Sequence, residues 1–115
     1  MTVKIKRVYD PAQPEDGYRI LVDRLWPRGL SKERAAVDLW LKEVAPSPAL
    51  RTWFGHEPAK WEEFERRYGE ELEELGAPLE RVRALEEREG VVTLLYAAKD
   101  VEHTHARVLA GFLAK

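Results

Sequence analysis

The sequence predicts a single α/β domain over residues 1–115, in which helices flank a small, mostly parallel sheet in three layers. Residues 91–98 form a continuous run that is apolar apart from Thr93 and rich in β-branched residues, as in a central strand covered on both faces. Residues 58–75 carry apolar side chains at every third or fourth position, as in an amphipathic helix. A chain of 115 residues, 44% of them hydrophobic, is long enough to bury one core without disulfides.

The composition excludes several classes of protein. The chain has no cysteine, so disulfides, thiolate metal sites and cysteine nucleophiles are excluded. It has no signal-like N-terminus and no apolar run as long as a membrane span, so we expect a soluble cytoplasmic protein without a membrane partner. The net charge of -2 disfavours duplex DNA as a partner. Abundant glutamate and arginine, with no asparagine and one glutamine, predict a thermostable protein.

Two strands are expected near the N-terminus. Residues 3–9 alternate apolar and basic side chains, and residues 18–25 form a mostly buried apolar run. The loop between them, residues 10–17, is rich in turn residues and too short to hold a crossover helix. The two strands therefore either pair antiparallel or are not simple parallel neighbours. Residues 35–41 fit a short strand as well as a helical turn, and their periodicity leaves both open.

Three helices are expected in the middle of the chain. Ser47, between two prolines, suits the start of the first helix. The second covers residues 58–75, and its seven glutamates predict a solvated outer face. Pro78 opens the third helix, which Gly90 ends. The positions of the last two helices that should face the core are Trp61, Phe64, Tyr68, Leu72, Leu75, Leu79, Val82 and Leu85.

The strand predicted at residues 91–98 runs directly into a last helix. Asp100 is well placed as the N-cap of that helix, and His105 would lie on its inner face. Open α/β sheets bind ligands at the carboxyl ends of their strands. If this strand and the one that ends at residue 25 are parallel, the loops that follow them share one edge of the sheet. The side chains that would converge there are Arg24, Trp26, Arg28, Lys99 and His105.

Such a cluster would form a cationic cleft with a helix N-terminus at its floor, which suits a phosphate or carboxylate group. Both arginines of the first loop could instead form ion pairs across it, and the carboxylates within reach are Asp23, Asp38 and Glu33. Trp26 fits a lid on the sheet as well as a stacking platform for a base or sugar. The candidate substrate-binding residues are Asp23, Arg24, Trp26, Arg28 and Lys32.

Lys99 and His105 are the candidate catalytic residues. His105 could act as a general acid or base, although a hydrogen-bonded core histidine gives the same pattern. Lys99 would be costly to bury unpaired, and a salt bridge to Asp23 would satisfy it as well as a ligand would. We expect no metal site, because His103 and His105 lie on different sides of a helix and no carboxylate pair completes a ligand set. The chain lacks a glycine-rich phosphate loop and a Gly-x-Ser-x-Gly motif, which disfavours dehydrogenation and serine hydrolysis, and we expect no cofactor.

Several motifs carry a resemblance to a known family. Residues 6–11 read KRVYDP, residues 16–32 read DGYRILVDRLWPRGLSK, and residues 94–100 read LLYAAKD, with His105 close behind. With these motifs the chain resembles the short, YeaO-like branch of the DUF488 family over nearly its whole length. The resemblance implies a Rossmann-like α/β fold and no settled activity.

The resemblance also bears on the candidate site residues. Longer members of the family carry an Asp-x-Arg motif after a strand and a histidine at the start of the last helix. These would fall at residues 23–25 or at Arg24, and near His105. The short branch typically has asparagine before that histidine, where this chain has Thr104. The cysteines of the longer relatives are absent here, so thiol chemistry does not transfer.

Two functions from different classes remain. In the first, the chain is an enzyme that binds a phosphate-bearing small molecule or nucleotide through its cations and moves a proton with His105. In the second, the same cleft only binds, and its ligand is a nucleotide, a nucleic-acid end or an acidic peptide. Trp40, Trp53 and Phe54 fit a core as well as a dimer face, so a homo-oligomer stays open.

Overall fold

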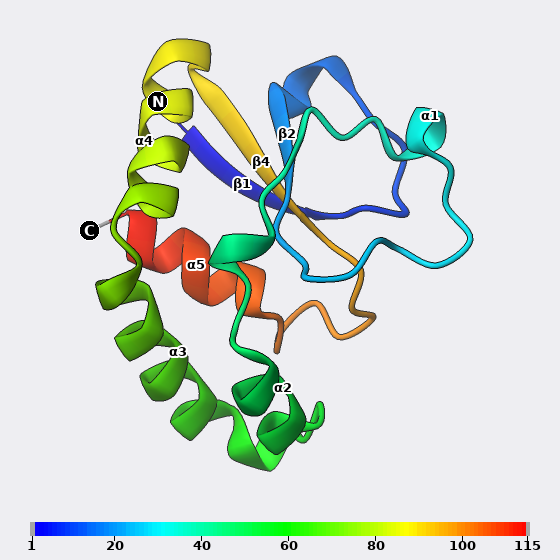
Figure 1. Ribbon diagram of the computed structural model, residues 1–115. Helices are drawn as coiled ribbons and strands as arrows, with labels where there is room; N and C mark the ends of the chain where they lie inside the picture. The colour runs from blue at the N-terminus through cyan, green and yellow to red at the C-terminus, as the bar shows by residue number, and fades with distance from the viewer. Residues whose placement is uncertain (1, 115) are drawn as a thin grey trace.

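The fold is built on a four-stranded parallel sheet whose strand order is β1-β4-β2-β3 (Figure 1). The computed structural model describes residues 2–114. β4 lies between β1 and β2, so the two N-terminal strands are not neighbours, which confirms the second of the two predicted alternatives. The strands are β1 (Thr2–Arg7), β2 (Tyr18–Leu21), β3 (Leu39–Trp40) and β4 (Val91–Tyr96).

Most of the chain between β3 and β4 is helical. Residues 35–41 fitted a helical turn as well as a short strand, and each interpretation is partly right. The segment begins with the last residue of the one-turn helix α1, and β3 lies near its end. None of the helices in the described part of the chain is long and apolar enough to span a membrane. The α-helices are α1 (Lys32–Ala35), α2 (Pro48–Phe54), α3 (Trp61–Leu75), α4 (Ala77–Glu89) and α5 (His105–Leu113), and short 3₁₀ helices cover Pro14–Asp16, Lys42–Val44 and Pro58–Lys60.

Local sequence explains where the middle helices begin and end. The hydroxyl of Ser47 accepts a hydrogen bond from the backbone N–H of Leu50 and so caps α2, as predicted. Gly90, with a positive φ of 85°, ends α4, as predicted. The second predicted helix begins later than expected, since residues 58–60 form a separate 3₁₀ helix before α3.

The start of α5 corrects the prediction that Asp100 caps the last helix. α5 begins at His105, and its N-cap is Thr104, whose side chain accepts a hydrogen bond from the N–H of Ala106. The carboxylate of Asp100 instead accepts hydrogen bonds from the N–H groups of the second and third residues after it. This closes a turn within the loop, so the helix starts further along the chain.

The two faces of the sheet have separate cores, which gives the predicted three layers. On one face α4 and α5 pack on the strands and α3 packs on α5, so these helices lie together on one side of the sheet (Figure 1). The other face is covered by the segment that follows β2, including α1. Strand residues of the first core are Ile20, Val92, Leu94 and Tyr96, and the buried residues of the second are Val8, Leu21, Ala35 and Leu95.

A buried ion pair holds the covering segment on the second face. Arg19, only 4% exposed, is paired with Asp16 and also donates to the carbonyl oxygens of Ala35 at 2.8 Å and Ala36 at 3.0 Å. The Nζ atom of Lys6 lies 3.1 Å from the same carboxylate. These groups satisfy one another inside the fold, so we assign the cluster a structural role. The sequence pattern alone did not reveal it.

Candidate functional site

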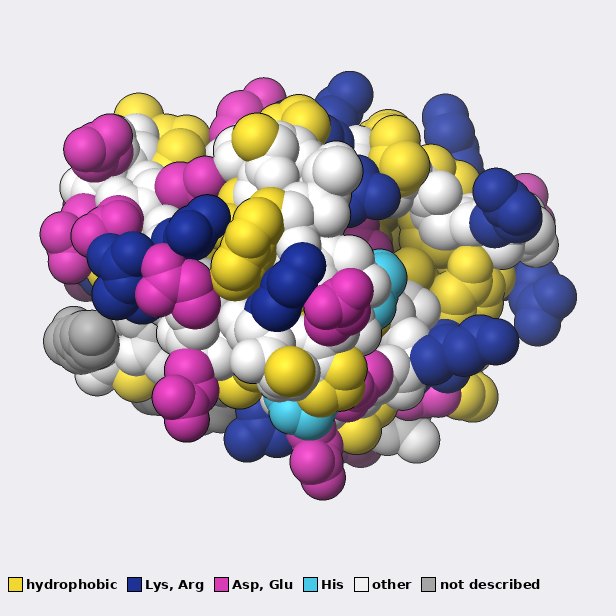
Figure 2. Space-filling view, turned by 90° about the horizontal axis from the view of Figure 1, so that it is seen from below, with side chains coloured by type: hydrophobic (Ala, Val, Ile, Leu, Met, Phe, Trp, Pro, Cys, Tyr) yellow, Lys and Arg dark blue, Asp and Glu magenta, His cyan; other side chains and the backbone are white. Residues whose placement is uncertain are grey.

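A cavity of about 550 Å³ opens at the carboxyl ends of β2 and β4, the edge of the sheet at which the sequence predicts a cleft. Figure 2 is a view from below Figure 1 and shows a hollow to the right of its centre, with hydrophobic side chains on its walls and His, Lys and Arg side chains around it. The walls come from the segment after β2, from α2 and the residues that flank it, from α3, and from the segment between β4 and α5. Residues of the lining include Asp23, Arg24, Arg51, Phe54, His56, Phe64, Lys99, Asp100, His103 and His105.

Asp23 and His105 form a close pair in the wall of this cavity. The Nε2 atom of His105 lies 3.3 Å from Oδ1 of Asp23 and 3.0 Å from the carbonyl oxygen of Val22. Because both neighbours are acceptors, we place the proton of the neutral ring on Nε2, which leaves Nδ1 as the acceptor nitrogen. Oδ2 of Asp23 accepts a hydrogen bond of 2.9 Å from the N–H of Ala97. The pair therefore ties the segments after β2 and β4 to the start of α5.

Burial shifts the pKa values of both members of the pair. Burial lowers the pKa of His105 below 6.5, although the neighbouring Asp23 carboxylate opposes the shift. The first residue of a helix is also an unfavourable place for a cation, because the helix dipole is positive there. Burial raises the pKa of Asp23 above 3.8, against the opposing charge of His105 and the hydrogen bond from Ala97. The imidazole of His105 is therefore neutral at pH 7.

Arg24, Arg51 and Lys99 bring positive charge to the cavity. The Nη2 atom of Arg24 donates to the carbonyl oxygens of residues 45 and 46, at 3.4 and 3.2 Å, while its buried Nε has no hydrogen-bond partner among residues 2–114. Arg51 and Lys99 are exposed, and neither has an ion-pair partner within the described chain. The two carboxylates of the lining each accept hydrogen bonds from within the fold. With three cations against two carboxylates, the charge of the lining is positive.

Of the side chains expected to converge, Arg24, Lys99 and His105 line the cavity, together with Asp23. The sequence left open an ion pair of Arg24 with a nearby carboxylate and one of Lys99 with Asp23. Among the described residues, Arg24 instead donates to carbonyl oxygens, and Asp23 is paired with His105. Thr104, at the position where the resemblance implies asparagine, uses its hydroxyl to cap α5. The remaining predicted residues, Trp26, Arg28 and Lys32, lie outside the cavity lining.

Trp26 lies on the opposite face of the sheet and acts as the lid that the sequence left as an alternative. Its Nε1 donates a hydrogen bond of 2.7 Å to the carbonyl oxygen of Leu30, and its ring meets that of Trp40 edge to face at 5.5 Å. β2 ends at Leu21, earlier than predicted, and the chain after Leu25 turns away to cover the second core. Trp26, Arg28 and Lys32 therefore lie away from the cavity.

Sequence reasoning missed the contribution of α2 and α3 to the site. Phe54 is 6% exposed and so belongs to the core, not to a dimer face, and its ring stacks on Phe64 at 4.5 Å. Arg51 lies three residues before Phe54 and therefore shares its side of α2. That spacing was visible in the sequence, but the packing of α2 against this edge of the sheet was not. His56, just after α2, also lines the cavity.

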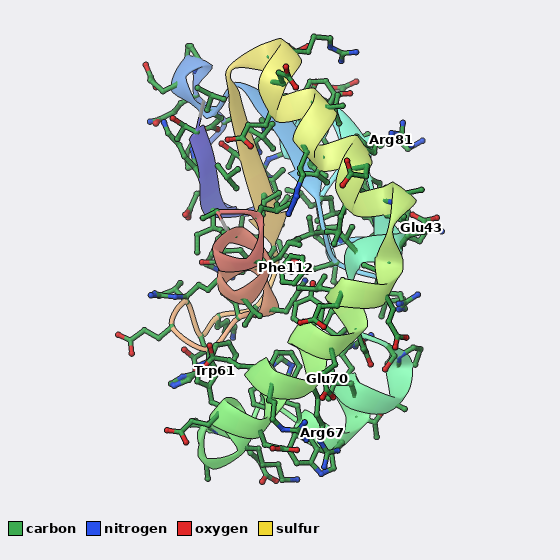
Figure 3. All side chains as sticks on the ribbon, turned by 90° about the vertical axis from the view of Figure 1, so that its left-hand side faces the viewer. Glu43, Trp61, Arg67, Glu70, Arg81 and Phe112 are labelled. Atoms are coloured by element: carbon green, nitrogen blue, oxygen red, sulfur yellow. The ribbon has the colours of Figure 1, made fainter. Side chains whose placement is uncertain are left out.

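His103 belongs to a second pair at the cavity, separate from His105. Its Nδ1 lies 2.8 Å from Oδ2 of Asp100, and its ring meets Trp61 edge to face at 5.3 Å. Figure 3 shows Trp61 at the start of α3, beside the loop that leads to α5. Within residues 2–114 there is no group of three or more His, Asp or Glu side chains arranged to hold a metal ion.

Comparisons with known proteins identify relatives over nearly the whole chain. Residues 2–115 match the profile of a family described as the inactive DUF488-N3 subclade. The chain is 46% identical over 111 residues to the uncharacterised protein Rv3073c of Mycobacterium tuberculosis, covering 96% of this chain and 92% of that protein. It is 45% identical over 113 residues to the uncharacterised protein YeaO of Escherichia coli, covering 98% of this chain and 97% of that protein. No solved structure matches the chain.

Proposed function

The chain belongs to the inactive DUF488-N3 subclade, in agreement with the family its motifs resemble, and from this membership we propose that it is a non-catalytic binding module for a phosphate-bearing small molecule or nucleotide. The observation that carries the proposal is the cavity at the carboxyl ends of β2 and β4, which combines apolar walls with an excess of positive charge. The description of the subclade as inactive favours binding over turnover.

The size and lining of the cavity support a ligand with a flat ring and an anionic group. Its volume of about 550 Å³ falls within the usual range of small-molecule sites, roughly 300–1,000 Å³. The apolar part of the lining, which includes the exposed Leu25 together with the nearly buried rings of Phe54 and Phe64, is surface against which a nucleobase could pack. Arg51 and Lys99 are exposed cations that could neutralise a phosphate.

The geometry of His105 disfavours a role as a general acid. The protonated nitrogen of its neutral ring is directed at Val22 and Asp23, so it has no proton to give to a ligand without breaking these contacts. Its lowered pKa keeps the ring neutral at pH 7. We therefore give the Asp23–His105 pair a positioning role, in which it fixes the two loops that form the cavity.

The test compares two double variants, each of which removes one arginine and one lysine, from different places on the molecule. Arg51→Gln/Lys99→Gln removes one arginine and one lysine from the cavity lining. Arg28→Gln/Lys32→Gln removes one of each from exposed positions outside it and serves as the matched control. Binding of the four ribonucleoside 5′-monophosphates and of inorganic phosphate is measured by calorimetry at low and moderate salt.

We expect the wild type to bind at least one nucleotide, more weakly as salt rises, because exposed charges are screened. The cavity variant should bind that nucleotide at least about 10-fold more weakly, since each charge-assisted hydrogen bond contributes about 1.5–3 kcal/mol. The control variant should keep its affinity within about twofold of the wild type, because its charges lie away from the ligand. Equal losses in both variants, or no binding by the wild type, would overturn the proposal.

A further inference from the structure

A second, smaller and more open hollow of about 220 Å³ lies along the side of α2, and all four of its lining residues are exposed. Its lining is Pro48, Arg51, Thr52 and His56, and it shares Arg51 and His56 with the main cavity. These two side chains therefore stand between the two hollows, and a ligand in the main cavity could extend past them. We name the smaller hollow the side cavity.

The side chains of the side cavity differ in chemistry from those of the main one. The guanidinium of Arg51, the hydroxyl of Thr52 and the imidazole of His56 can all donate hydrogen bonds, and no carboxylate is present in this lining. The main cavity, by contrast, contains two carboxylates and most of the apolar wall. An anionic group is therefore better matched by the side cavity, and the uncharged ring of a ligand by the main one.

We propose that the side cavity is the phosphate subsite, in which Arg51, Thr52 and His56 bind a phosphate monoester whose organic part occupies the main cavity. The inference rests on the proposed function and goes beyond it by naming which cations hold the anion. It assigns the phosphate to Arg51 in place of Lys99, which lies at the end of β4 and lines only the main cavity.

The local backbone holds the subsite residues together. Pro48, Arg51 and Thr52 are spaced three and four residues apart on α2, so they lie on one side of the helix. α2 ends at Gly55 in the left-handed conformation, and His56 follows with a φ of 58°, which is unusual for a residue with a side chain. This turn brings the imidazole of His56 back beside the ring of Phe54, at 6.2 Å between centroids. The same turn thus places His56 at both cavities.

The experiment measures how much the phosphate adds to binding. The quantity measured is the nucleotide-to-nucleoside ratio, which is the affinity for the tightest-binding nucleotide divided by the affinity for the matching nucleoside. Inorganic phosphate is titrated in parallel. The variants are Arg51→Gln, Thr52→Val and His56→Gly, the last of which removes the imidazole while relieving the left-handed backbone. Arg28→Gln, an exposed arginine outside both cavities, is the matched control.

We expect Arg51→Gln to lower the nucleotide-to-nucleoside ratio by about 10-fold or more, and the other two subsite variants to lower it by about threefold each. In Arg51→Gln and Thr52→Val, which remove no ring, affinity for the nucleoside should change by less than about twofold. An unchanged ratio in Arg51→Gln would overturn this inference alone, and a fall in a further variant, Lys99→Gln, would then place the phosphate in the main cavity. Wild-type protein that binds neither nucleotide nor nucleoside would overturn the proposed function as well.

Discussion

The substitution Tyr68→Phe tests whether α3 holds the cavity wall in place. Tyr68 is fully buried, and its hydroxyl donates a hydrogen bond of 2.5 Å to the carbonyl oxygen of Val44. The two residues after Val44 supply the carbonyl oxygens that accept hydrogen bonds from Arg24. Removing the hydroxyl therefore removes one of the hydrogen bonds that tie the wall segment to α3, while leaving the aromatic ring in the core.

The expected loss of stability follows from the burial of both partners. A typical hydrogen bond contributes about 1 kcal/mol net, whereas leaving a buried acceptor unpaired costs about 1–3 kcal/mol. Val44 is as inaccessible as Tyr68, so water cannot readily replace the phenol. We therefore expect the free energy of unfolding of Tyr68→Phe to fall by about 2 kcal/mol.

The assay is urea unfolding followed by circular dichroism at pH 7, and Tyr96→Phe is the matched control. Tyr96 is only 3% exposed, but its hydroxyl makes no hydrogen bond to any residue in the described range, so its loss should cost less than about 0.5 kcal/mol. Both variants should keep the wild-type dependence on urea, because the surface exposed on unfolding is unchanged. A loss below about 0.5 kcal/mol for Tyr68→Phe, or equal losses in both variants, would refute the reasoning.

Three further predictions concern stability. The pKa of His105 is lowered in the fold, so His105 of the unfolded chain takes up a proton at a higher pH than His105 of the folded chain. The free energy of unfolding of the wild type should therefore fall as the pH drops below 6.5. In acid titrations, His105→Gln should lack this part of the pH dependence. Ser47→Ala removes both a helix cap and a hydrogen bond to a carboxylate of α3, and chemical unfolding should show a loss of about 1–2 kcal/mol; no loss would contradict the capping role. Gly17→Ala would place a Cβ 2.4 Å from the carbonyl oxygen of Val91, so its melting temperature should fall well below that of Gly29→Ala, where the φ is also positive but no atom is close. Equal melting temperatures for these two variants would exclude a role for the close contact.

The elements that the sequence predicts well are those that depend on local pattern. β4 is apolar apart from Thr93, and α3 and α4 repeat their apolar residues at helical spacing, so these three elements can be recognised without information from distant residues. The start of α5 is different. Asp100 and Thr104 are both good capping residues, and the choice between them depends on the path of the loop.

Strand order and the full lining of the site depend on contacts between distant segments. The expected edge of the sheet is the one that holds the cavity, because all strands are parallel and the loops after β2 and β4 meet there. Arg51 and His56 were not predicted, since nothing local shows that α2 packs beside that edge. The sequence left open whether Trp26 is a lid or part of the cleft, because the length of β2 determines which side of the sheet the following residues reach.

The position of β4 in the sheet has a consequence for the newly synthesised chain. β1 pairs only with β4 among the described strands, and β4 comprises Val91–Tyr96, so β1 is made long before its partner exists. Until β4 has been made, residues 2–7 have no strand of this chain to pair with. Lys4 and Lys6 place positive charges on one of its sides, and charged side chains on an open strand oppose pairing with the wrong partner. The lysines of β1 therefore carry the kind of charge that opposes mispairing at a stage when no folded core is yet available.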